Sequence, residues 1–579
     1  MNELKVDASK VASIFRGMAD LLSIKGENPF RIRAYEKAAD TLERLPGDLE
    51  ELYKQGKLKD VPGLGKGMLE KISAILNTGK LAAYEDLKRE IPESMRELLS
   101  IPEVGPKTVK LLYEKMRVRN IEDLEKVVKS GKLRNLPGMG AKTEENILRG
   151  IKLYQTSRAR ILLGRALPLV KEVITELEDK ASPWIDRISP AGSLRRGKET
   201  IGDIDILVSS KNPSPVMDFF TRLSCVEEIL ARGETKSSIL TNQGLQIDLR
   251  VVSPDSFGAA LQYFTGSKSH NINLRERAIK KGWKINEYGV FSGKGEKIAG
   301  RDEKEVYACL GLSFISPELR EDRGEIEAAE QGKLPSLVKE KDIKGDLHIH
   351  SKMSDGSETI AQLVEKARKK GYEYIAITDH SSSLRIGRGL SEETLLAQIE
   401  EIKEINSQMR GFRVLAGSEV DIKKDGSLDF PDEILAKLDV VIAALHTGFK
   451  QDRETITNRV IKALQNPFVK IFAHPTGRLL GEREPYAIDL DKVLEVAKNR
   501  NIRLEINAQP QRLDLTDIWI IEARKRGVKM VISTDAHNKE GLDFISLGVI
   551  TARRGWLETS DVINTLSTEE LIRNLELSI

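Results

Sequence analysis

The strongest constraint on the fold comes from six of the seven histidines, which lie beyond residue 344 and follow short apolar runs. In Ile-Ala-Ile-Thr-Asp-His380, for example, a strand-like run ends on a histidine. A β/α barrel presents its chemistry at the C-terminal ends of its strands, and histidine is the commonest metal ligand. One such histidine is usually a packed or surface residue, but six in equivalent positions, accompanied by acids, predict a metal site. The candidate ligands are His348, His350, Asp355, His380, Glu419, His446, His474, Asp535 and His537.

Composition limits the other possibilities. The 579 residues allow several domains, and a formal net charge of +3 gives no overall basic character that would indicate a nucleic-acid partner. Cys225 and Cys309 are the only cysteines, too few for a disulfide framework or a thiolate zinc site. The N-terminus lacks a signal-peptide pattern, and no apolar run approaches about 18 residues. We therefore expect a cytoplasmic protein without a membrane partner.

Three similar glycine-containing turns interrupt the helical pattern of residues 1–150, and each leads directly into a helical segment. Glycines allow sharp turns and close approach of a ligand, and the free N–H groups at a helix start attract an anion. The second turn has Glu103 in place of its first glycine, and this acid would repel phosphate. One such turn is often an ordinary connector, but three copies resemble helix-hairpin-helix motifs, which bind DNA phosphates. The predicted DNA-binding residues are Gly63, Gly65, Lys66, Gly105, Lys107, Gly138, Gly140 and Lys142.

Residues 191–252 carry a second chemical pattern. The alternation in Asp203-Ile-Asp205 puts two carboxylates on one face of a strand, and Asp248 lies in another alternating run. Three carboxylates on adjacent strands can bind two divalent ions about 3.5–4 Å apart for in-line phosphoryl transfer. Asp-x-Asp alone is common on exposed strands, but the upstream turn Gly-Ser-Leu-Arg-Arg-Gly at 192–197 is suited to bind a triphosphate. Together the two patterns indicate a nucleotidyltransferase.

These motifs resemble the catalytic core of family X DNA polymerases, the DNA polymerase beta family. The runs Tyr-Phe-Thr-Gly-Ser at 263–267 and Ile-Asn-Glu-Tyr at 285–288 resemble the thumb of that family. The resemblance implies that Asp203, Asp205 and Asp248 bind the catalytic metals, Mg²⁺ or Mn²⁺. It implies nucleotide contacts from Gly192, Ser193, Arg196, Gly202, Tyr263, Phe264, Gly266 and Asn271, and a template contact from Arg275. It also implies that Arg250 pairs with an acid during closure, whereas His270 is interpreted as a packing or substrate-side residue.

The first 80 residues resemble the small lyase-type domain of the same family. Residues 28–39 and the first glycine turn match its 5′-phosphate pocket, and Lys71 matches its Schiff-base lysine. Matching phosphate-binding residues are Arg31, Tyr35 and Lys59. However, Phe30 and Gly67 replace an expected histidine and lysine, and a nucleophilic lysine needs desolvation or neighbouring cations. We therefore expect 5′-phosphate binding and favour a solvated Lys71 over lyase chemistry.

The histidine-rich segment resembles a PHP (polymerase and histidinol phosphatase) domain, a distorted β/α barrel with three metal ions, and all nine usual ligand positions are filled. The resemblance implies that Glu419 bridges two metals. It implies one site with His348, His350 and Asp535, a second with His446 and His474, and a third with Asp355, His380 and His537. Zinc or manganese suits this mixed ligand set, and a metal-activated water would attack a phosphate. Three nearby basic residues could bind substrate phosphate, but we favour surface charge for each of them: Arg385, Lys450 and Arg478.

The sequence thus predicts a multidomain fold with a helical helix-hairpin-helix region, an α+β palm and thumb, and a C-terminal distorted barrel. Predicted boundaries are 1–80 for the lyase-like domain, 81–150 for helical fingers, 151–260 for the palm, 261–318 for the thumb, 319–344 for an exposed linker or surface helix, and 345–579 for the PHP domain. We expect a monomeric DNA-repair polymerase that uses deoxynucleoside triphosphates to fill short gaps in gapped or nicked duplex DNA. The barrel would act as a 3′-5′ exonuclease, an AP endonuclease or both. The alternatives are a polymerase with an inactive barrel, or a small-molecule phosphatase fused to a nucleotidyltransferase.

Overall fold

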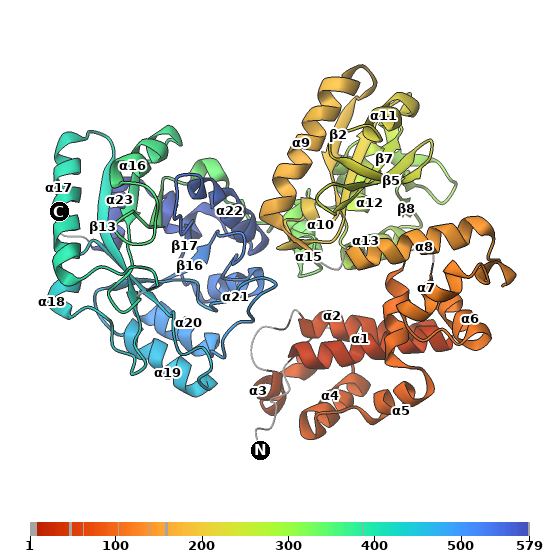
Figure 1. The fold of residues 1–579 in the computed structure, drawn as a ribbon, viewed down its shortest axis with the longest axis horizontal. Helices are drawn as coiled ribbons and strands as arrows, with labels where there is room; N and C mark the ends of the chain where they lie inside the picture. Colours follow the sequence, from red (N-terminus) through yellow and green to blue (C-terminus); the bar gives the residue numbers. More distant parts are fainter. Residues whose placement is uncertain are drawn as a thin grey trace. The chain divides into compact units, whose positions relative to one another are not determined.

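The chain forms two compact units, Met1–Ala159 and Arg160–Ile579. Figure 1 shows a computed structural model of the chain. It describes residues 8–43, 45, 49–61, 63–101, 104–136, 138–156, 160–384 and 386–576. Among the described helices, none combines the length and apolar character needed to cross a membrane.

The first unit is helical. Apolar residues at helical spacing, such as Val11, Phe15, Met18 and Leu22, form the buried face of its first helix and pack into one core. Its α-helices are α1 (Ala8–Lys25), α2 (Pro29–Glu43), α3 (Leu49–Lys54), α4 (Lys66–Thr78), α5 (Ala82–Glu90), α6 (Pro106–Met116), α7 (Ile121–Lys129) and α8 (Ala141–Thr156). The expected helical N-terminal region is therefore confirmed.

The second unit begins with a five-stranded sheet, the palm, in the order β2-β4-β7-β6-β5. Strands β4 and β7 are parallel, and the other pairs are antiparallel. Its strands are β2 (Arg187–Pro190), β4 (Ile204–Ser209), β5 (Val226–Arg232), β6 (Lys236–Thr241) and β7 (Gln246–Val252), preceded by β1 (Ile161–Leu162), which pairs with β3 (Thr200–Ile201). Its helices are α9 (Leu163–Ala181), α10 (Gly192–Arg195) and α11 (Pro213–Phe220).

Strand alternation gives the palm sheet two different faces. Ile204, Ile206 and Val208 of β4 pack with α9 and α11 in one core. The residues between them point to the other face, where Leu207 packs with Phe257 and neighbouring residues. The sheet therefore presents Asp205 on the face opposite α9.

The thumb follows the palm. It comprises α12 (Phe257–Thr265), α13 (Lys268–Lys280), β8 (Lys284–Asn286), β9 (Gly289–Phe291), β10 (Lys297–Ala299), α14 (Glu303–Cys309) and α15 (Glu325–Glu330). The three strands form a small antiparallel sheet. His270 is fully buried, with its ring nitrogens bonded to Glu325 (2.7 Å) and Tyr307 (2.9 Å), so it is the packing residue that we predicted.

The stretch 319–344 differs from the exposed linker that we predicted. Arg320, Glu321 and Glu325 are at most 4% exposed. Their charges are compensated by partners distant in sequence, including Glu303 for Arg320 and Arg554 for Glu321. Mixed charge at residues 320–325 reflects buried ion pairs, so this part is not the exposed linker of the prediction. The helix α15 (Glu325–Glu330), with Glu327 and Glu330 exposed, agrees with the surface helix that we named as the alternative.

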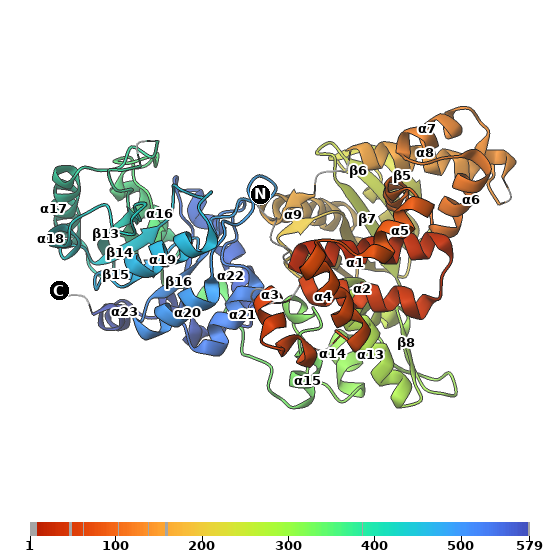
Figure 2. The ribbon, with the colours of Figure 1, turned by 90° about the horizontal axis from the view of Figure 1, so that it is seen from below.

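The rest of the chain is a barrel of seven parallel strands in consecutive order, β11 to β17. The strands are β11 (Gly345–Ile349), β12 (Tyr374–Ile377), β13 (Arg413–Asp421), β14 (Val440–Ala444), β15 (Val469–Phe472), β16 (Arg503–Asn507) and β17 (Met530–Ser533). The helices are α16 (Ile360–Lys369), α17 (Glu392–Gln408), α18 (Asp432–Leu435), α19 (Arg453–Leu464), α20 (Leu490–Asn499), α21 (Asp517–Arg526), α22 (Ile545–Arg554) and α23 (Thr568–Leu575). In Figure 2, α17 and α18 lie at the left edge of the barrel, outside β13.

The first and last strands of the barrel meet. A parallel bridge joins Ile349 to Ala536, and the amide of buried Asn564 donates to the carbonyls of Gly345 and Ile532. At the N-terminal ends of the strands, Leu571 and Leu575 of α23 join the inner core. The barrel is therefore nearly closed, as the distorted β/α barrel of the prediction requires.

Candidate functional site

The palm brings the predicted carboxylates together. Asp205 on β4 lies directly opposite Asp248 on the neighbouring parallel strand β7, and Asp203 immediately precedes β4. Asp248 accepts a hydrogen bond from Gln246 (2.7 Å) and forms an ion pair with Lys236 (2.8 Å). Partial burial and the carboxylates of Asp203 and Asp248 raise the pKa of Asp205 to about 6. Divalent cations would relieve this repulsion, so the cluster suits metal ions.

The predicted triphosphate turn lies against these carboxylates. Gly192, with φ of +61°, approaches Asp205 so closely that an added Cβ would lie 2.6 Å from the Asp205 Oδ2 atom. The guanidinium of Arg196 is bonded to the carboxylate of Glu321 (3.1 Å) and to the carbonyl of Thr265. Ser193 directly follows Gly192 in this turn. Gly202 directly precedes Asp203. A Cβ added at Gly202 would lie 3.1 Å from a guanidinium nitrogen of Arg160.

The thumb residues predicted to contact the nucleotide lie on α12, α13 and the turn between them. The rings of Tyr263 and Phe264 pack edge to face, 5.2 Å apart. Asn271 donates to the carbonyl of Tyr263 (2.7 Å) and accepts from Gln262 (2.6 Å). A Cβ added at Gly266 would lie 3.2 Å from a guanidinium nitrogen of Arg196. Tyr263, Phe264 and Gly266 therefore belong to the same neighbourhood as the triphosphate turn.

Arg250 and Arg275, the other two basic residues with predicted roles in this region, lie in different environments. Arg250 lies on the carboxylate face of β7 with its guanidinium 4.6 Å from the Phe264 ring centre. Arg275 is exposed on α13, where a template strand could reach it.

The barrel gathers all nine predicted ligands at one end. Each lies at or just after the C-terminal end of a strand, as for Glu419 near the end of β13. Among the residues that the structure describes, three groups have ligand atoms close enough to share an ion. They are His348, His350 and Asp535; His380, Glu419 and His446; and His350, Asp355, His380 and His537. His350 and His380 each belong to two groups, so the division is less strict than the one we expected.

Glu419 is central to the cluster. One carboxylate oxygen lies 2.9 Å from His380 and 3.4 Å from His348, and the other lies 2.8 Å from His474 and 3.3 Å from His446. Burial alone would raise the pKa of Glu419, but His446, His348 and His380 keep it well below its ordinary value. Its two oxygens therefore face different pairs of histidines, as a carboxylate that bridges two ions would require.

The donor chemistry fits metal ions. Among the described residues, the buried nitrogens His348 Nε2, His350 Nε2 and His380 Nδ1 have no hydrogen-bond partner. Burial and the neighbouring His380 lower the pKa of His350 to about 3, so its ring is neutral, which is the metal-binding form. His474 and Asp535 have positive φ angles of 28° and 51°, a conformation that is uncommon outside glycine and clusters at functional sites.

Sequence reasoning missed two carboxylates that orient the ligands. Glu505 on β16 is fully buried; it bonds His348 Nδ1 (2.7 Å) and accepts the backbone N–H of His474 (2.8 Å). Asp421 on β13 bonds His446 Nδ1 (2.5 Å). Such partners fix the ring so that Nε2 faces the metal. Glu505 is the middle residue of β16 (Arg503–Asn507), so the position after an apolar run that marks the histidines does not mark it in the sequence.

The glycine turns of the first unit lie at helix starts. Gly65 and Gly105 directly precede α4 and α6, and Gly140 directly precedes α8. Gly63 and Gly138 have positive φ angles of 99° and 77°, which favour glycine. Exposed lysines stand in the first turns: Lys66, Lys107 and Lys142. Within the described part of the chain, nothing lies within 4 Å of a would-be Cβ at Gly65, Gly105 or Gly140, so these helix ends are open. Glu103 lies outside the described residues.

The predicted 5′-phosphate pocket lies between α2 and α4. Tyr35 is buried, and the Lys71 ammonium lies 5.8 Å from its ring centre and donates to the carbonyl of Gly67 (2.9 Å). Lys59 is exposed, and Arg31 pairs with Glu27 (3.6 Å). Lys71 thus lies beside an aromatic ring and bonds to its own helix, and the preference for a solvated Lys71 over lyase chemistry stays a prediction.

Of the basic residues near the barrel motifs, Arg478 was wrongly interpreted as surface charge. It is buried and pairs with Glu199 of the palm (2.6 Å), a residue far away in the sequence. Lys450 is exposed, and Arg385 lies outside the described residues.

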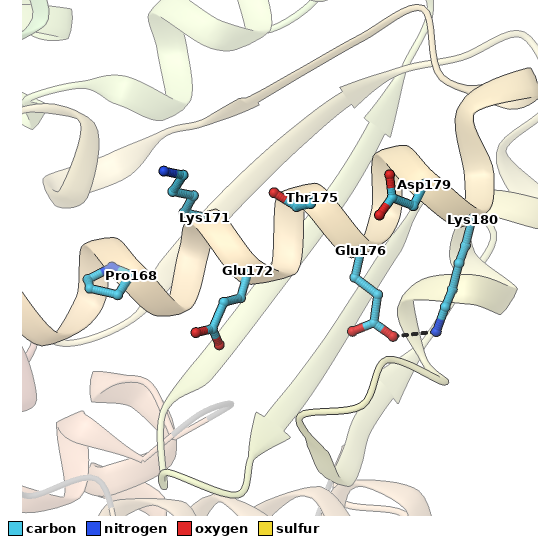
Figure 3. A pocket seen from close by; sticks show the side chains of 7 residues that line it. All are labelled: Pro168, Lys171, Glu172, Thr175, Glu176, Asp179 and Lys180. Atoms are coloured by element: carbon cyan, nitrogen blue, oxygen red, sulfur yellow. Dashed lines mark hydrogen bonds and ion pairs between the residues drawn. The ribbon is translucent and has the colours of Figure 1, made fainter.

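One shallow pocket lies along α9, on the palm face opposite Asp205 (Figure 3). Its lining comes from this single helix and consists of Pro168, Lys171, Glu172, Thr175, Glu176, Asp179 and Lys180. Glu176 is already paired with Lys180 and Ser224. The pocket therefore presents no convergent set of free groups.

These features define a class of protein: a nucleotidyltransferase with helical DNA-binding motifs, carried on one chain with a metal-binding β/α barrel. Family models agree. Residues 260–321 match the DNA polymerase beta thumb, and residues 346–509 match the PHP domain. Residues 7–81 match a helix-hairpin-helix domain, and residues 95–152 match a SAM-like helix-hairpin-helix tandem.

Similar proteins extend this match along the chain. A protein of Bacillus subtilis (strain 168) described as DNA polymerase/3'-5' exonuclease PolX is 39% identical over 97% of this chain and 98% of its own length. DNA polymerase lambda of Arabidopsis thaliana is 27% identical over 54% of this chain and 61% of its own. A probable phosphatase of Thermoanaerobacter sp. (strain X514) is 33% identical over 33% of this chain and 78% of its own. The chain belongs to the family X DNA polymerases that carry a C-terminal PHP domain.

Proposed function

We propose that the chain is a DNA-repair polymerase that fills short gaps in duplex DNA, and that its barrel removes nucleotides from 3′ ends. The observation that carries the polymerase half is the placement of Asp205 opposite Asp248, with the Gly192 turn against Asp205. A triphosphate on that turn would lie beside the carboxylates that hold the metals. The Bacillus subtilis relative, named as a polymerase and 3'-5' exonuclease, supports both halves.

In the palm, each group has a separate task. Mg²⁺ or Mn²⁺ bound by Asp203, Asp205 and Asp248 would activate the primer hydroxyl and neutralise the leaving pyrophosphate. Arg196 would bind triphosphate oxygens after exchanging its present bond to Glu321. Lys236, which pairs with Asp248, would give way to the cation.

In the barrel, three Zn²⁺ or Mn²⁺ ions on the nine ligands would acidify a water molecule and neutralise the phosphodiester oxygens. Glu419 would bridge two of them, because its oxygens face different histidines. Glu505 and Asp421 would keep His348 and His446 in the tautomer that binds metal through Nε2.

The substrates follow from the DNA-binding region. Open helix starts with lysines favour phosphate contacts, so binding would be salt-sensitive and independent of sequence. We infer that gapped or nicked duplex DNA and deoxynucleoside triphosphates are the partners and that the protein acts as a monomer in the cytoplasm. An inert barrel does not account for nine filled ligand positions with oriented rings. A small-molecule phosphatase would not need three helix-hairpin turns.

The test uses a one-nucleotide-gapped duplex with a labelled primer and Mn²⁺. The proposal predicts extension with nucleotides and shortening without them, with Asp248→Ala removing only extension and His348→Ala removing only shortening. Absence of extension would reject the polymerase. Unchanged activities in His348→Ala would make the barrel a scaffold, and cleavage of an abasic-site duplex without shortening would make it an AP endonuclease.

A further inference from the structure

The triphosphate turn of the palm rests on a helix of the barrel. Nη1 of Arg554, the last residue of α22, donates a hydrogen bond of 2.6 Å to the backbone carbonyl of Arg196. Gly197, with φ of +65°, packs so closely on α22 that an added Cβ would lie 2.2 Å from Ile550 Cγ2. Figure 1 shows α22 on the side of the barrel nearest α10. The palm therefore supports one side of this turn, and the barrel supports the other.

Arg554 also shares a hydrogen-bond partner with the Arg196 side chain. It is 3% exposed, and its guanidinium donates to Glu321 Oε1 (3.1 Å) and to Asp517 Oδ2 (2.5 Å). The same Glu321 oxygen accepts from Arg196 Nε (3.1 Å). The two arginines thus share one carboxylate oxygen.

Glu321 is ionised in this arrangement. Burial alone would raise its pKa, but Arg554, Lys198 and Arg196 lower it to about 2. An ionised carboxylate that is shared among several cations binds each one less strongly than it would bind one alone. Removing Arg554 would leave Glu321 with more unsatisfied charge and strengthen its hold on Arg196.

We infer that Arg554, although it belongs to the barrel, is a positioning residue for nucleotidyl transfer in the palm. It fixes the peptide of Arg196 through the carbonyl and moderates the competition between Glu321 and the triphosphate for the Arg196 guanidinium. This role rests on the proposed function of the turn at 192–197. It means that a barrel side chain sets nucleotide affinity without touching the nucleotide.

The experiment compares single-nucleotide insertion by the full-length wild type, Arg554→Ala and Arg554→Lys. We expect Arg554→Ala to raise the KM for the nucleotide about tenfold while kcat falls less than about threefold. Lysine keeps the charge but loses the forked geometry, so it should recover part of the affinity. Arg553→Ala is the matched control: it is the adjacent residue on α22 and bonds Glu318 and the Val338 carbonyl instead. Its KM should equal that of the wild type.

A second substitution tests the shared carboxylate. Glu321→Gln should weaken the competing bond, so Arg554→Ala combined with Glu321→Gln should have a lower KM than Arg554→Ala alone. An unchanged KM in Arg554→Ala would overturn the inference. So would an equal loss of extension and of 3′ shortening, because that pattern indicates general destabilisation of the barrel and palm.

Direct binding separates this inference from the polymerase proposal. Displacement of a fluorescent nucleotide analogue by inorganic tripolyphosphate, with Mg²⁺, measures the tripolyphosphate affinity of the turn at 192–197. This measurement does not depend on primer extension. If the wild type does not extend primers but Arg554→Ala still lowers tripolyphosphate affinity, the polymerase proposal fails and the inference stands. Equal tripolyphosphate affinity in the wild type and Arg554→Ala would overturn it.

Discussion

At the scale of single residues, the palm carboxylates predict a pH-dependent metal affinity. The pKa of Asp205 is raised to about 6 by its burial and by Asp203 and Asp248. A proton competes with the cation, so below about pH 6 the Mg²⁺ concentration for half-maximal extension should rise about tenfold per pH unit. Magnesium titrations of single-nucleotide insertion between pH 5 and 8 measure this. A half-maximal concentration that is constant over this range would contradict the assignment.

Glu505 supplies a second prediction at this scale. Glu505→Gln keeps the size of the side chain but weakens the acceptor that orients His348 and His474. We expect 3′ shortening to fall about 10- to 100-fold, the usual cost of losing such a partner. Primer extension by the same protein is the control and should stay unchanged. Wild-type shortening by Glu505→Gln would show that the ring orientation does not depend on this carboxylate.

In the barrel, the sequence indicated the candidate metal ligands but not the carboxylates that orient them. The predicted ligands stood out because the histidines follow short apolar runs and acids lie near them, so local pattern and resemblance agree. Glu505 and Asp421 act through partners on other strands, and no local pattern marks them. Arg478 was misread for the same reason, because its partner Glu199 lies in another domain of the sequence.

At the scale of elements, the helix starts of the first unit predict phosphate binding. The described first turns of α4 and α6 contain no acidic residue, and Lys66 and Lys107 are exposed there. Each phosphate contact adds about 0.9 to the slope of log affinity against log salt. Lys66→Ala and Lys107→Ala should therefore each weaken binding to gapped DNA and reduce the slope by up to about 0.9.

Fluorescence anisotropy over a salt series measures both quantities. Lys129→Ala is the control, because Lys129 is an exposed helix lysine that pairs with Glu125 in α7, away from a helix start. If it changes affinity as much as Lys66→Ala does, general charge rather than the helix start explains the binding.

The stretch 319–344 shows why the burial of some segments could not be predicted from the sequence. Residues 319–344 combine few apolar residues with mixed charge, which is typical of an exposed linker. In the fold, Arg320 and Glu321 are buried because Glu303, Arg554 and other charges surround them. The pairing involves residues that are close only after folding, so composition alone could not distinguish a linker from a buried charge network.

At the scale of the whole molecule, metal binding should stabilise the barrel. Several of its buried histidine nitrogens, including His348 Nε2 and both ring nitrogens of His350, have no hydrogen-bond partner among the described residues, which is costly without an ion. A ligand at about a hundredfold excess over its Kd contributes about 3 kcal/mol, which corresponds to a rise in Tm on the order of 5–10 °C. Thermal unfolding with Zn²⁺ or Mn²⁺ against a chelator tests this. Glu419→Gln should reduce the shift, and an equal shift in that variant would place the stabilising ion elsewhere.

The central claim is that one chain carries two separate metal sites that act on the same DNA end. The most direct measurement follows a labelled primer with a mismatched 3′ nucleotide beside a short gap, in the presence of Mn²⁺ and nucleotides. We predict that the wild type removes the mismatch and then extends the primer. Asp248→Asn should only shorten it, and Glu419→Gln should leave the mismatch in place. Removal of the mismatch by Glu419→Gln at the wild-type rate, or extension by Asp248→Asn, would contradict the account.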